Sequence, residues 1–445
     1  MTKKTNVFLI SLGCSKNLVD SEYLLGFIRA SGNNIVSNLE KAEKVVINTC
    51  GFIQPAVEET IDTILRMVDL KEKGKLKGLV VTGCFVQRYG YKLLKEIPEV
   101  DAWLGPGELN RISTVLNKSC PEIPIYVKKP VFLADHTTPR IYSTPFYTAY
   151  LKIAEGCSSE CTYCLIPKLR GPFRSRGIDS LIKEARKMVL AGVKEINLIA
   201  QDITMYGSDS GSSGLLLEDL LEELLAINGL TWIRLQYCNP ARVSERLLDL
   251  IEENDAICPY LDIPLQHVNH NILVSMGRDD LKESPLELLE RIRSRKRRIS
   301  LRTTLMVGFP GETEAIFEEL YDFVKWACFD HLGVFIFSSE KGTRAARIKL
   351  EIENGKAEQR KDQIMQLQHL LLEETQQRMV GQKVPVLIEG HCSETDFLLK
   401  GRTATMAPEV DGQVLINKGN GVEGEIMSVF IREAYAYDLI GELCV

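Results

Sequence analysis

The sequence lacks the long apolar run that a membrane-spanning helix needs. Nothing in its 445 residues approaches about 18 consecutive apolar positions, and the apolar stretch near the start covers only residues 7–10. That stretch is too short for the core of a secretory signal, and no small-residue cleavage site follows it. We therefore expect a cytoplasmic protein without a membrane partner.

The sequence also lacks a strong excess of one charge. It carries 54 Lys and Arg against 60 Asp and Glu, a formal net charge of -6, so the charge of the whole chain indicates neither a nucleic-acid coat nor a polybasic membrane anchor. With 45% hydrophobic residues the chain can bury large cores, and its length suits two or three domains. The 12 cysteines are expected to be reduced thiols, because disulfides are rare in cytoplasmic proteins.

Three strand-then-helix units are predicted in the first segment. The strands are expected at residues 7–12, 45–48 and 79–82, and the helices at 19–30, 56–70 and 86–97. This alternation predicts a parallel sheet. The strands lead into Cys14, Cys50 and Cys84, each beside a glycine. Because carboxyl ends of parallel strands meet at one edge, we expect these thiols to converge; the alternative is three small buried residues.

A proline-rich connection is predicted between this segment and the next. It contains prolines at 121, 124, 130, 139 and 145, and we place a domain boundary near residue 140. The alternation then resumes with strands expected at 148–154, 195–200, 232–237, 260–263, 300–307 and 332–337. Ser284 and Glu287 form a predicted capping box for one of the intervening helices. Six such units favour a partial (β/α)6 barrel.

The last segment has a different pattern. A polar helix is predicted near 355–378, followed by short alternating runs at 384–388, 397–400, 412–416 and 425–431, which suit a small antiparallel β-barrel. Acidic residues outnumber basic ones from residue 378 onward. The predicted fold class is thus α/β, with an N-terminal parallel α/β domain (1–140), a central partial barrel (141–377) and the small C-terminal barrel (378–445).

The sharpest local motif is Cys157-Ser-Ser-Glu-Cys161-Thr-Tyr-Cys164, directly after the first strand of the second domain. Thiolates are soft ligands that suit zinc and iron–sulfur clusters. A structural zinc site needs four ligands, and no fourth Cys or His lies near this loop. Three thiols therefore favour a four-iron cluster with one open iron. The remaining cysteines (120, 238, 258, 328, 392 and 444) show no ligand spacing and are expected to be packing residues.

The CxxxCxxC motif after the first strand of a six-strand partial barrel resembles the radical S-adenosylmethionine (AdoMet) superfamily. The stretch EGCSSECTYCLIPKLRGPFRSR, the GFPGET of residues 308–313 and the upstream SLGC, NTCG and TGC together resemble the methylthiotransferases, over essentially the whole chain. The resemblance implies that Cys157, Cys161 and Cys164 hold one 4Fe-4S cluster. It implies a second 4Fe-4S cluster on Cys14, Cys50 and Cys84, and a C-terminal domain like the TRAM domain.

The resemblance also suggests residues that contact AdoMet, and some of them have a plainer alternative. Gln201 and Asp202, at the end of the second barrel strand, stand where the superfamily holds the methionine amino group. Arg176 is suited to bind the carboxylate, unless it is a solvated loop arginine. Gly308 would let the backbone approach the nucleoside, unless it only forms a tight turn. Phe337 is either an adenine platform or part of the barrel core. His267 is assigned no role.

Two substrate classes exist in this family, a modified adenosine in tRNA and an aspartate of small-subunit ribosomal protein S-twelve. An acidic C-terminal domain disfavours tRNA and favours a basic ribosomal protein. The stretches SLGCSKNLVDSE and APEVDG resemble the ribosomal-protein branch, although Ser15, Met406 and Phe337 depart from its usual residues. The alternative is a methylthiotransferase for N6-isopentenyl or threonylcarbamoyl adenosine in tRNA. A run of basic residues at 291–298 is either a nucleic-acid patch or a solvated helix face.

The implied reaction uses AdoMet twice. One AdoMet methylates a sulfur held at the N-terminal cluster, and a second is cleaved at the barrel cluster to a radical that removes hydrogen from the aspartate β-carbon, which then takes the methylthio group. The implied partners are ribosomal protein S-twelve and an electron donor such as flavodoxin or ferredoxin, without a direct tRNA substrate. Two rival interpretations remain: a radical AdoMet enzyme of another kind, and a redox-sensing scaffold without turnover.

Overall fold

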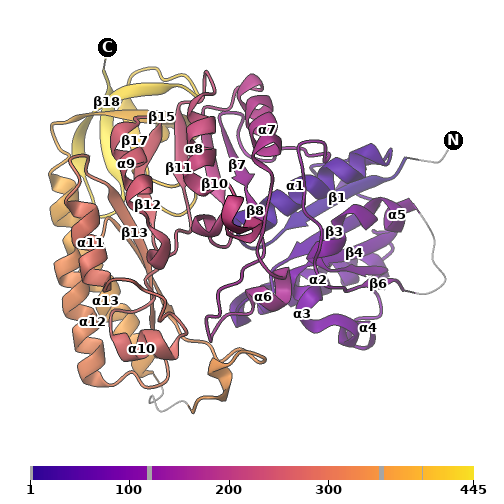
Figure 1. Ribbon diagram of the computed structural model, residues 1–445. Coiled ribbons are helices and arrows are strands. Elements are labelled where there is room, and N and C mark those ends of the chain that lie inside the picture. The colour runs from indigo at the N-terminus through magenta and orange to yellow at the C-terminus, as the bar shows by residue number, and fades with distance from the viewer. Residues whose placement is uncertain (1–3, 118–122, 350–354, 393, 445) are drawn as a thin grey trace.

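A six-stranded parallel sheet forms the N-terminal region of the computed structural model, which describes residues 4–117, 123–349, 355–392 and 394–444 (Figure 1). The strand order is β2-β1-β3-β4-β5-β6. The strands are β1 (Asn6–Ser11), β2 (Asn34–Ile35), β3 (Lys44–Thr49), β4 (Gly78–Gly83), β5 (Ala102–Leu104) and β6 (Ile125–Tyr126). The predicted parallel sheet is confirmed. Part of the expected connection joins it as β6, while Cys120 and Pro121 lie outside the described residues.

Helices cover both faces of this sheet because its strands are apolar on both sides. They are α1 (Ser15–Ala30), α2 (Gln54–Glu72), α3 (Cys84–Tyr89), α4 (Leu93–Glu96) and α5 (Ile112–Asn117). Leu24 and Ile28 of α1 pack on Val46 and Val80 of one face, whereas α2 and α3 pack on the other. The outer side of α1 meets the central region (Figure 1).

The central region is a six-stranded parallel sheet with the order β14-β13-β12-β11-β10-β7, which confirms the partial barrel. Its strands are β7 (Thr148–Lys152), β10 (Glu195–Ile199), β11 (Trp232–Leu235), β12 (Ile257–Asp262), β13 (Ser300–Val307) and β14 (His331–Ile336). A short antiparallel pair, β8 (Ala154–Glu155) and β9 (Arg174–Ser175), brackets the CxxxCxxC loop. The motif thus begins beside the first barrel strand.

The helices of this region are α6 (Ile166–Arg170), α7 (Ile178–Leu190), α8 (Leu217–Leu225), α9 (Glu245–Glu253), α10 (His270–Ser275), α11 (Pro285–Arg293), α12 (Glu314–Ala327) and α13 (Lys356–Gln377). The predicted capping box of Ser284 and Glu287 is present at the start of α11. Cys238 and Cys258 are fully buried, as expected of packing residues. Cys328 is exposed, so that expectation is wrong there; it ends α12 with a left-handed φ of 40°.

The C-terminal region is a closed five-stranded barrel with the order β15-β16-β17-β19-β18. Its strands are β15 (Lys383–Cys392), β16 (Thr395–Thr403), β17 (Val414–Lys418), β18 (Ile426–Ala434) and β19 (Leu439–Leu443). The barrel was expected to be antiparallel, but β17 and β19 pair in parallel. The sequence pattern had not indicated β19, and this last strand closes the barrel. No helix among the described residues is long and apolar enough to cross a membrane.

Candidate functional site

The structure brings Cys14, Cys50 and Cys84 to one edge of the N-terminal sheet. Cys14 follows β1, Cys50 follows β3 and Cys84 follows β4 as the first residue of α3. These three strands are direct neighbours in the sheet. The thiols are close enough for the charge of Cys14 to raise the pKa of Cys50, and for both to raise the pKa of Cys84. We call these three residues the N-terminal thiol group.

Two glycines with left-handed backbones allow the three loops to approach one another. Gly13 has a φ of 93°, and a Cβ on it would lie 2.8 Å from the Cβ and 3.3 Å from the Sγ of Cys50. Gly83 has a φ of 107°, and its Cβ would lie 2.5 Å from the carbonyl oxygen of Thr49. Other residues would be strained at both positions and would collide with their neighbours. The glycines beside the cysteines therefore form part of the site.

The three N-terminal thiols have different electrostatic environments. Burial raises the pKa of Cys50, and it raises the pKa of Cys84 to about 11. Burial acts on Cys14 in the same direction, but the positive charges of Lys16 and Arg170, together with the backbone N–H groups of Asn17 and Lys16, outweigh it and lower the pKa of Cys14. The charge of Arg170 acts on all three thiols. A cationic surround favours thiolates, the form that binds iron.

Cys157, Cys161 and Cys164 occupy the single loop between β8 and α6, and we call them the barrel thiol group. The backbone N–H of Ser159 donates to the Sγ of Cys157, and that of Ile166 donates to the Sγ of Cys164, both at 3.4 Å. Burial raises the pKa of Cys157, and it raises the pKa of Cys164 to about 12. The N–H groups thus point at sulfur atoms that carry negative charge once they bind metal.

Both thiol groups fit a four-iron cluster in their donor chemistry. All six cysteines are free thiols, and each group supplies three soft ligands, which leaves one iron open. Among the residues that the structure describes, no three His, Cys, Asp or Glu side chains are arranged to hold a single metal ion. A cluster binds each thiolate through a different iron, so its ligands stand farther apart than those of one ion.

Gln201 and Asp202 lie directly after β10, next to the barrel thiol group. The charge of Asp202 raises the pKa of Cys157, which places the two side chains close together. The Oε1 of Gln201 is buried and has no hydrogen-bond partner among the described residues. A buried amide oxygen without a partner is costly and indicates a site for a donor. Asp202 is already engaged, because it accepts from the N–H of Thr204 at 3.0 Å and pairs with Arg242 at 3.1 Å.

Gly308 and Phe337 follow β13 and β14 at the opposite edge of the barrel sheet. Gly308 has a φ of 77°, and its N–H donates to Glu312 at 3.0 Å. Gly308 therefore forms the tight turn that was expected as its alternative role. Phe337 is buried and packs edge-to-face on Phe309, with ring centroids 5.0 Å apart. Tyr163, from the barrel thiol loop, packs against the same apolar cluster. The structure thereby brings this edge of the barrel to the CxxxCxxC loop.

Arg176 is engaged elsewhere. It is buried, donates to the carbonyl oxygen of Lys152 at 2.8 Å and pairs with Glu184. Its terminal nitrogens therefore have protein partners, and it is neither a solvated arginine nor free for a carboxylate. A different buried arginine lies near the barrel thiols: Arg278 donates to the hydroxyl of Tyr163 at 3.4 Å, and its charge lowers the pKa of Cys164. No motif in the sequence pointed to Arg278.

A buried network of charges joins the two thiol groups. Arg170, at the end of α6, pairs with Asp20 of α1 at 2.6 Å and donates to the Oδ1 of Asn17 at 3.1 Å. Lys152 of β7 pairs with Asp20 and with Glu155. Because α6 begins two residues after Cys164, this short helix carries Arg170 from the barrel thiol group to the N-terminal one.

A second buried network fixes the C-terminal barrel to the central region and removes one of its carboxylates from the surface. Asp411, from the APEVDG stretch, pairs with Arg302 and lies 3.2 Å from His331. It also accepts from the hydroxyl of Tyr260 at 2.8 Å. Its side chain is fully buried, so it holds the two barrels together. Glu409, Glu423 and Glu425 are exposed and remain available to a partner.

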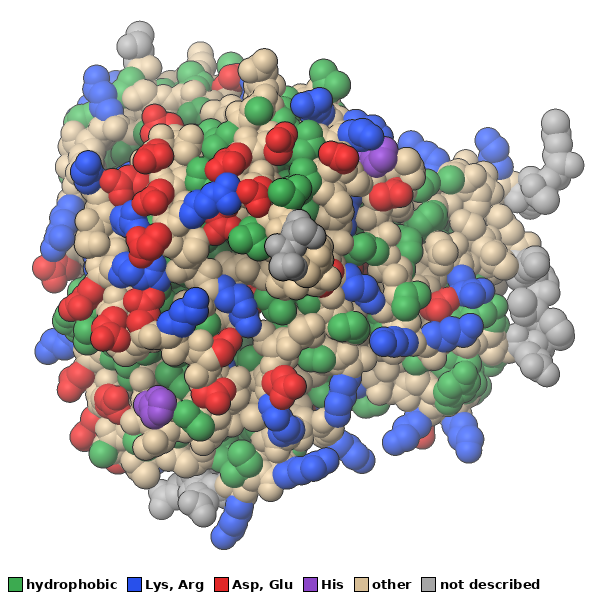
Figure 2. Space-filling view, viewed as in Figure 1, with side chains coloured by type: hydrophobic (Ala, Val, Ile, Leu, Met, Phe, Trp, Pro, Cys, Tyr) green, Lys and Arg blue, Asp and Glu red, His purple; other side chains and the backbone are tan. Residues whose placement is uncertain are grey.

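The basic run at 291–298 is largely committed to the protein itself. Arg291 pairs with Glu283 and Glu245, Arg295 pairs with Asp249, and Arg298 pairs with Asp330. Figure 2 shows acidic and basic side chains interleaved on this side of the molecule. These pairs neutralise much of the charge that a phosphate backbone would need. The run therefore behaves as a paired, solvated face.

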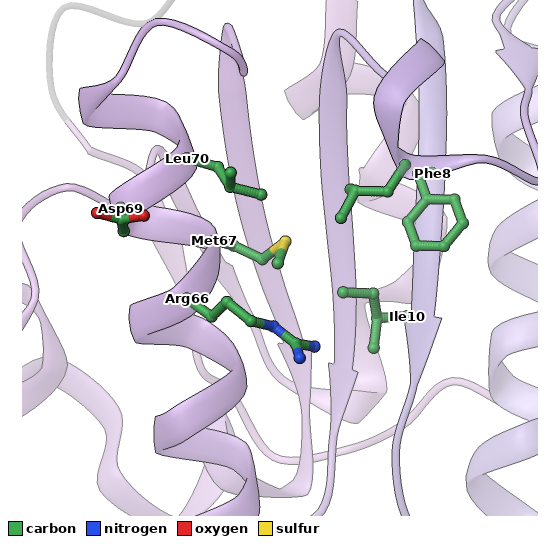
Figure 3. A pocket seen from close by; sticks show the side chains of 7 residues that line it. Phe8, Ile10, Arg66, Met67, Asp69 and Leu70 are labelled. Atoms are coloured by element: carbon green, nitrogen blue, oxygen red, sulfur yellow. The ribbon is translucent and has the colours of Figure 1, made fainter.

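An apolar pocket of about 550 Å³ lies between β1 and α2 (Figure 3). Its walls include Phe8, Ile10, Met67 and Leu70. None of the cysteines or proposed AdoMet contacts lines it. The pocket is separate from the thiol groups, which lie at the ends of the strands rather than on this face of the sheet.

Sequence profiles of three families match successive parts of the chain. The uncharacterized protein family UPF0004 matches residues 6–105, the Radical SAM superfamily matches residues 151–324, and the TRAM domain matches residues 380–444. The first match contains the N-terminal thiol group and the second contains the barrel thiol group. The third corresponds to the closed C-terminal barrel.

Curated relatives match over nearly their whole length. The chain is 46% identical to a ribosomal protein uS12 methylthiotransferase RimO of Geotalea uraniireducens, over 99% of this chain and 98% of that protein. It is 44% identical to proteins of the same name from Geobacter sulfurreducens, over 99% of both chains, and from Clostridioides difficile, over 98% of both.

Solved structures share the fold at low identity. The radical S-adenosylmethionine methyltransferase TsrM from Kitasatospora setae superposes with a TM-score of 0.56 and 16% identity, over 74% of this chain and 73% of that one. The cobalamin-dependent S-adenosylmethionine radical enzyme OxsB superposes with a TM-score of 0.51 and 14% identity, over 82% and 56% of the two chains. At such identities the likeness concerns the fold alone.

Proposed function

The chain belongs to the RimO family of ribosomal protein uS12 methylthiotransferases, and from this membership we propose that it inserts a methylthio group at the β-carbon of an aspartate of uS12. It is a radical AdoMet enzyme, so a 4Fe-4S cluster and AdoMet are its cofactors. Modification of tRNA adenosine is not favoured, because the full-length relatives cited above carry the name of the ribosomal-protein enzyme.

We assign a 4Fe-4S cluster to each thiol group. Cys157, Cys161 and Cys164 hold the one that belongs to the radical AdoMet barrel, and Cys14, Cys50 and Cys84 hold the second. The observation that carries the second assignment is the convergence of three free thiols at adjacent strand ends, with Gly13 leaving room beside the Sγ of Cys50. Burial of three small residues does not by itself account for it, because residue Cys14 keeps exposed surface even though its thiol group is desolvated.

The cluster held by the barrel thiol group would supply the electron for radical cleavage of AdoMet. The cluster held by the N-terminal thiol group would carry the sulfur atom to be transferred. The unpartnered Oε1 of Gln201 would accept a hydrogen bond from the methionine amino group, and Asp202 would add negative charge beside it. Gly308 and Phe337 would border the nucleoside from the other edge. Arg176 instead supports Glu184, and Arg278 is the better-placed cation for the carboxylate of AdoMet.

The buried charges between the N-terminal and central regions hold the two thiol groups in a fixed relative position. Asp20, Lys152, Glu155 and Arg170 are mutually paired and almost fully buried. Such pairs are strongly directional and exclude water from the joint. We infer that this network fixes the N-terminal thiol group relative to the barrel, so that a substrate carbon between them can reach both.

The proposed organisation has three domains, at 1–140, 141–377 and 378–445. The end of α13 at Gln377 and the start of β15 at Lys383 support the last limit. We propose that exposed Glu409, Glu423 and Glu425 help to recruit the basic ribosomal protein, that a flavodoxin or ferredoxin delivers electrons, and that tRNA is not a direct substrate. Since ribosomes are the source of the substrate, the site of action is proposed to be the cytoplasm.

The test is to incubate reduced, cluster-reconstituted protein with AdoMet and uS12 and to measure the masses of uS12 peptides. One aspartate-containing peptide should gain the mass of a methylthio group in place of a hydrogen. Fragmentation should locate the addition on the aspartate side chain. A tRNA fraction in a parallel reaction should remain unmodified. Modification of tRNA adenosine without modification of uS12 would overturn the proposal.

A further inference from the structure

Lys16 is a buried lysine that has no acidic partner. It is 8% exposed, and among the described residues no Asp or Glu oxygen lies within 4.0 Å of its ammonium group, which instead lies 3.1 Å from the centre of the Tyr237 ring. Lysines are almost never fully buried unless they are paired. Lys152, a buried lysine in the same joint between the domains, pairs with both Asp20 and Glu155. Lys16 therefore has no ion pair like that of its neighbour, and Asp262, a carboxylate that feels its charge, lies beyond ion-pair distance.

The position of Lys16 connects it with the chemistry. It lies two residues after Cys14, in the first turn of α1, and its charge lowers the pKa of that thiol. Tyr237, the ring beneath it, follows β11 at the carboxyl edge of the barrel sheet, on the same side as Gln201 and Asp202. Lys16 thus lies between the N-terminal thiol group and the open end of the barrel.

Tyr237 is held in a strained conformation that keeps its ring in this place. Its φ is 67°, which is unusual for a residue with a large side chain. Its N–H donates to Asp262 at 3.2 Å, and its hydroxyl lies 3.4 Å from the Oγ of Ser15. Backbone strain of this kind is concentrated at functional sites. The ring contacts the ammonium by a cation–π interaction and leaves its hydrogen-bond donors free for an oxygen ligand.

We propose that Lys16 binds the side-chain carboxylate of the substrate aspartate. The inference rests on the proposed function, in which the carbon that reacts is bonded directly to that carboxylate. An ammonium group that fixes the carboxylate beside Cys14 also fixes the β-carbon near the sulfur to be transferred. Because the site is largely removed from water, a charge-assisted hydrogen bond there is stronger than at the surface. Lys16 would then select an aspartate over an uncharged side chain.

The test compares Lys16→Met and Lys16→Arg with the matched surface variant Lys183→Met, whose lysine is exposed on α7. Each cluster-reconstituted enzyme is titrated with uS12 and with uS12 in which the target aspartate is replaced by asparagine. The wild-type enzyme and Lys183→Met should bind the aspartate form more tightly. The Lys16→Met enzyme should bind the aspartate form of uS12 roughly 10- to 100-fold more weakly than wild type does, as expected for the loss of a hydrogen bond between charged groups. It should bind the aspartate and asparagine forms alike. Lys16→Arg should recover part of the preference.

The outcomes separate this inference from the proposed function. If the wild-type enzyme modifies uS12 but Lys16→Met keeps the full preference for aspartate over asparagine, Lys16 does not bind the carboxylate. If Lys16→Met binds both forms weakly with the original preference, it has only disturbed the structure, and the inference is equally overturned. If the wild-type enzyme does not modify uS12 at all, the proposed function itself is wrong. Iron content and circular dichroism show that each variant is folded and loaded.

Discussion

The barrel thiol group comes from one loop, whereas the N-terminal thiol group comes from three strand ends more than thirty residues apart. The barrel loop positions its sulfurs largely through local contacts, such as the N–H groups of Ser159 and Ile166. The N-terminal group depends on the pairing of β1, β3 and β4, and on glycines where those strands end. The first site is therefore encoded locally, and the second exists only when the sheet is formed.

The largest expected effect comes from removing one thiol group at a time. Wild-type enzyme should hold roughly eight irons per chain, and replacing Cys157, Cys161 and Cys164 with Ala should leave roughly four. Replacing Cys14, Cys50 and Cys84 with Ala should also leave roughly four, with AdoMet cleavage retained and no sulfur inserted. Iron analysis and assay of 5'-deoxyadenosine check both variants. Complete loss of iron from either folded variant would contradict two independent sites.

A smaller loss of iron is expected from adding a single methyl group at Gly13. Gly13→Ala places a Cβ 2.8 Å from the Cβ of Cys50 at a φ of 93°, so it should disturb the N-terminal thiol group and not the barrel loop. We expect loss of up to half of the iron, with the barrel cluster still visible by electron paramagnetic resonance. Gly355→Ala is the matched control, because that glycine also has a positive φ, 81°, but no atom of the described residues lies within 4 Å of its Cβ. Equal iron loss in both variants would mean that backbone strain alone matters.

The smallest effect on the two thiol groups is expected from replacing Glu195, which lies at the start of β10, the end of that strand away from the thiols. Arg402 and Arg234 lower the pKa of Glu195 to about 2, against the effect of its burial. Because the folded pKa lies below the unfolded value of about 4.3, the stabilisation is present above that value and is lost as the pH falls toward 2. Glu195→Gln should cost about 3 kcal/mol of unfolding free energy at pH 7, as expected when one partner of a buried ion pair is removed.

Thermal unfolding of iron-free protein between pH 7 and pH 3 checks this expectation. The difference in Tm between wild type and Glu195→Gln should shrink as the pH falls, because the wild type loses its advantage. Reconstituted Glu195→Gln should still hold the full complement of iron in both thiol groups. A constant difference in Tm at every pH would show that the carboxylate charge does not stabilise the joint between the barrels.

The sequence could predict the barrel thiol group more directly than its surroundings. The spacing of Cys157, Cys161 and Cys164 is a local pattern, and the strand-helix alternation placed Cys14, Cys50 and Cys84 at one sheet edge. Lys16 and Arg278 had no such pattern, because their importance depends on which partners the fold gives or denies them. Whether a given arginine is solvated or buried in an ion pair, as with Arg176, depends on tertiary packing alone.

A charge count describes a whole domain and does not say which of its charged residues lie at the surface. Asp411 added to the acidic total of the C-terminal domain, yet it is buried against Arg302 and Tyr260. The strand β19 was missed because it is short, lies close to the end of the chain and pairs in parallel with β17, which hairpin signals do not indicate. Burial and long-range pairing are the properties that a linear pattern does not contain.

The outer side of α1 also bears on how this protein can vary. Asp20 and Glu22 project from this helix of the N-terminal sheet, and their cationic partners Lys152, Arg170 and Arg140 lie beyond it in the chain. A fragment that ends after β6 would expose two carboxylates that have no counterions of their own. The N-terminal region is consequently not a transferable module. We expect substitutions on one side of this interface to constrain those on the other, because each carboxylate needs its cation.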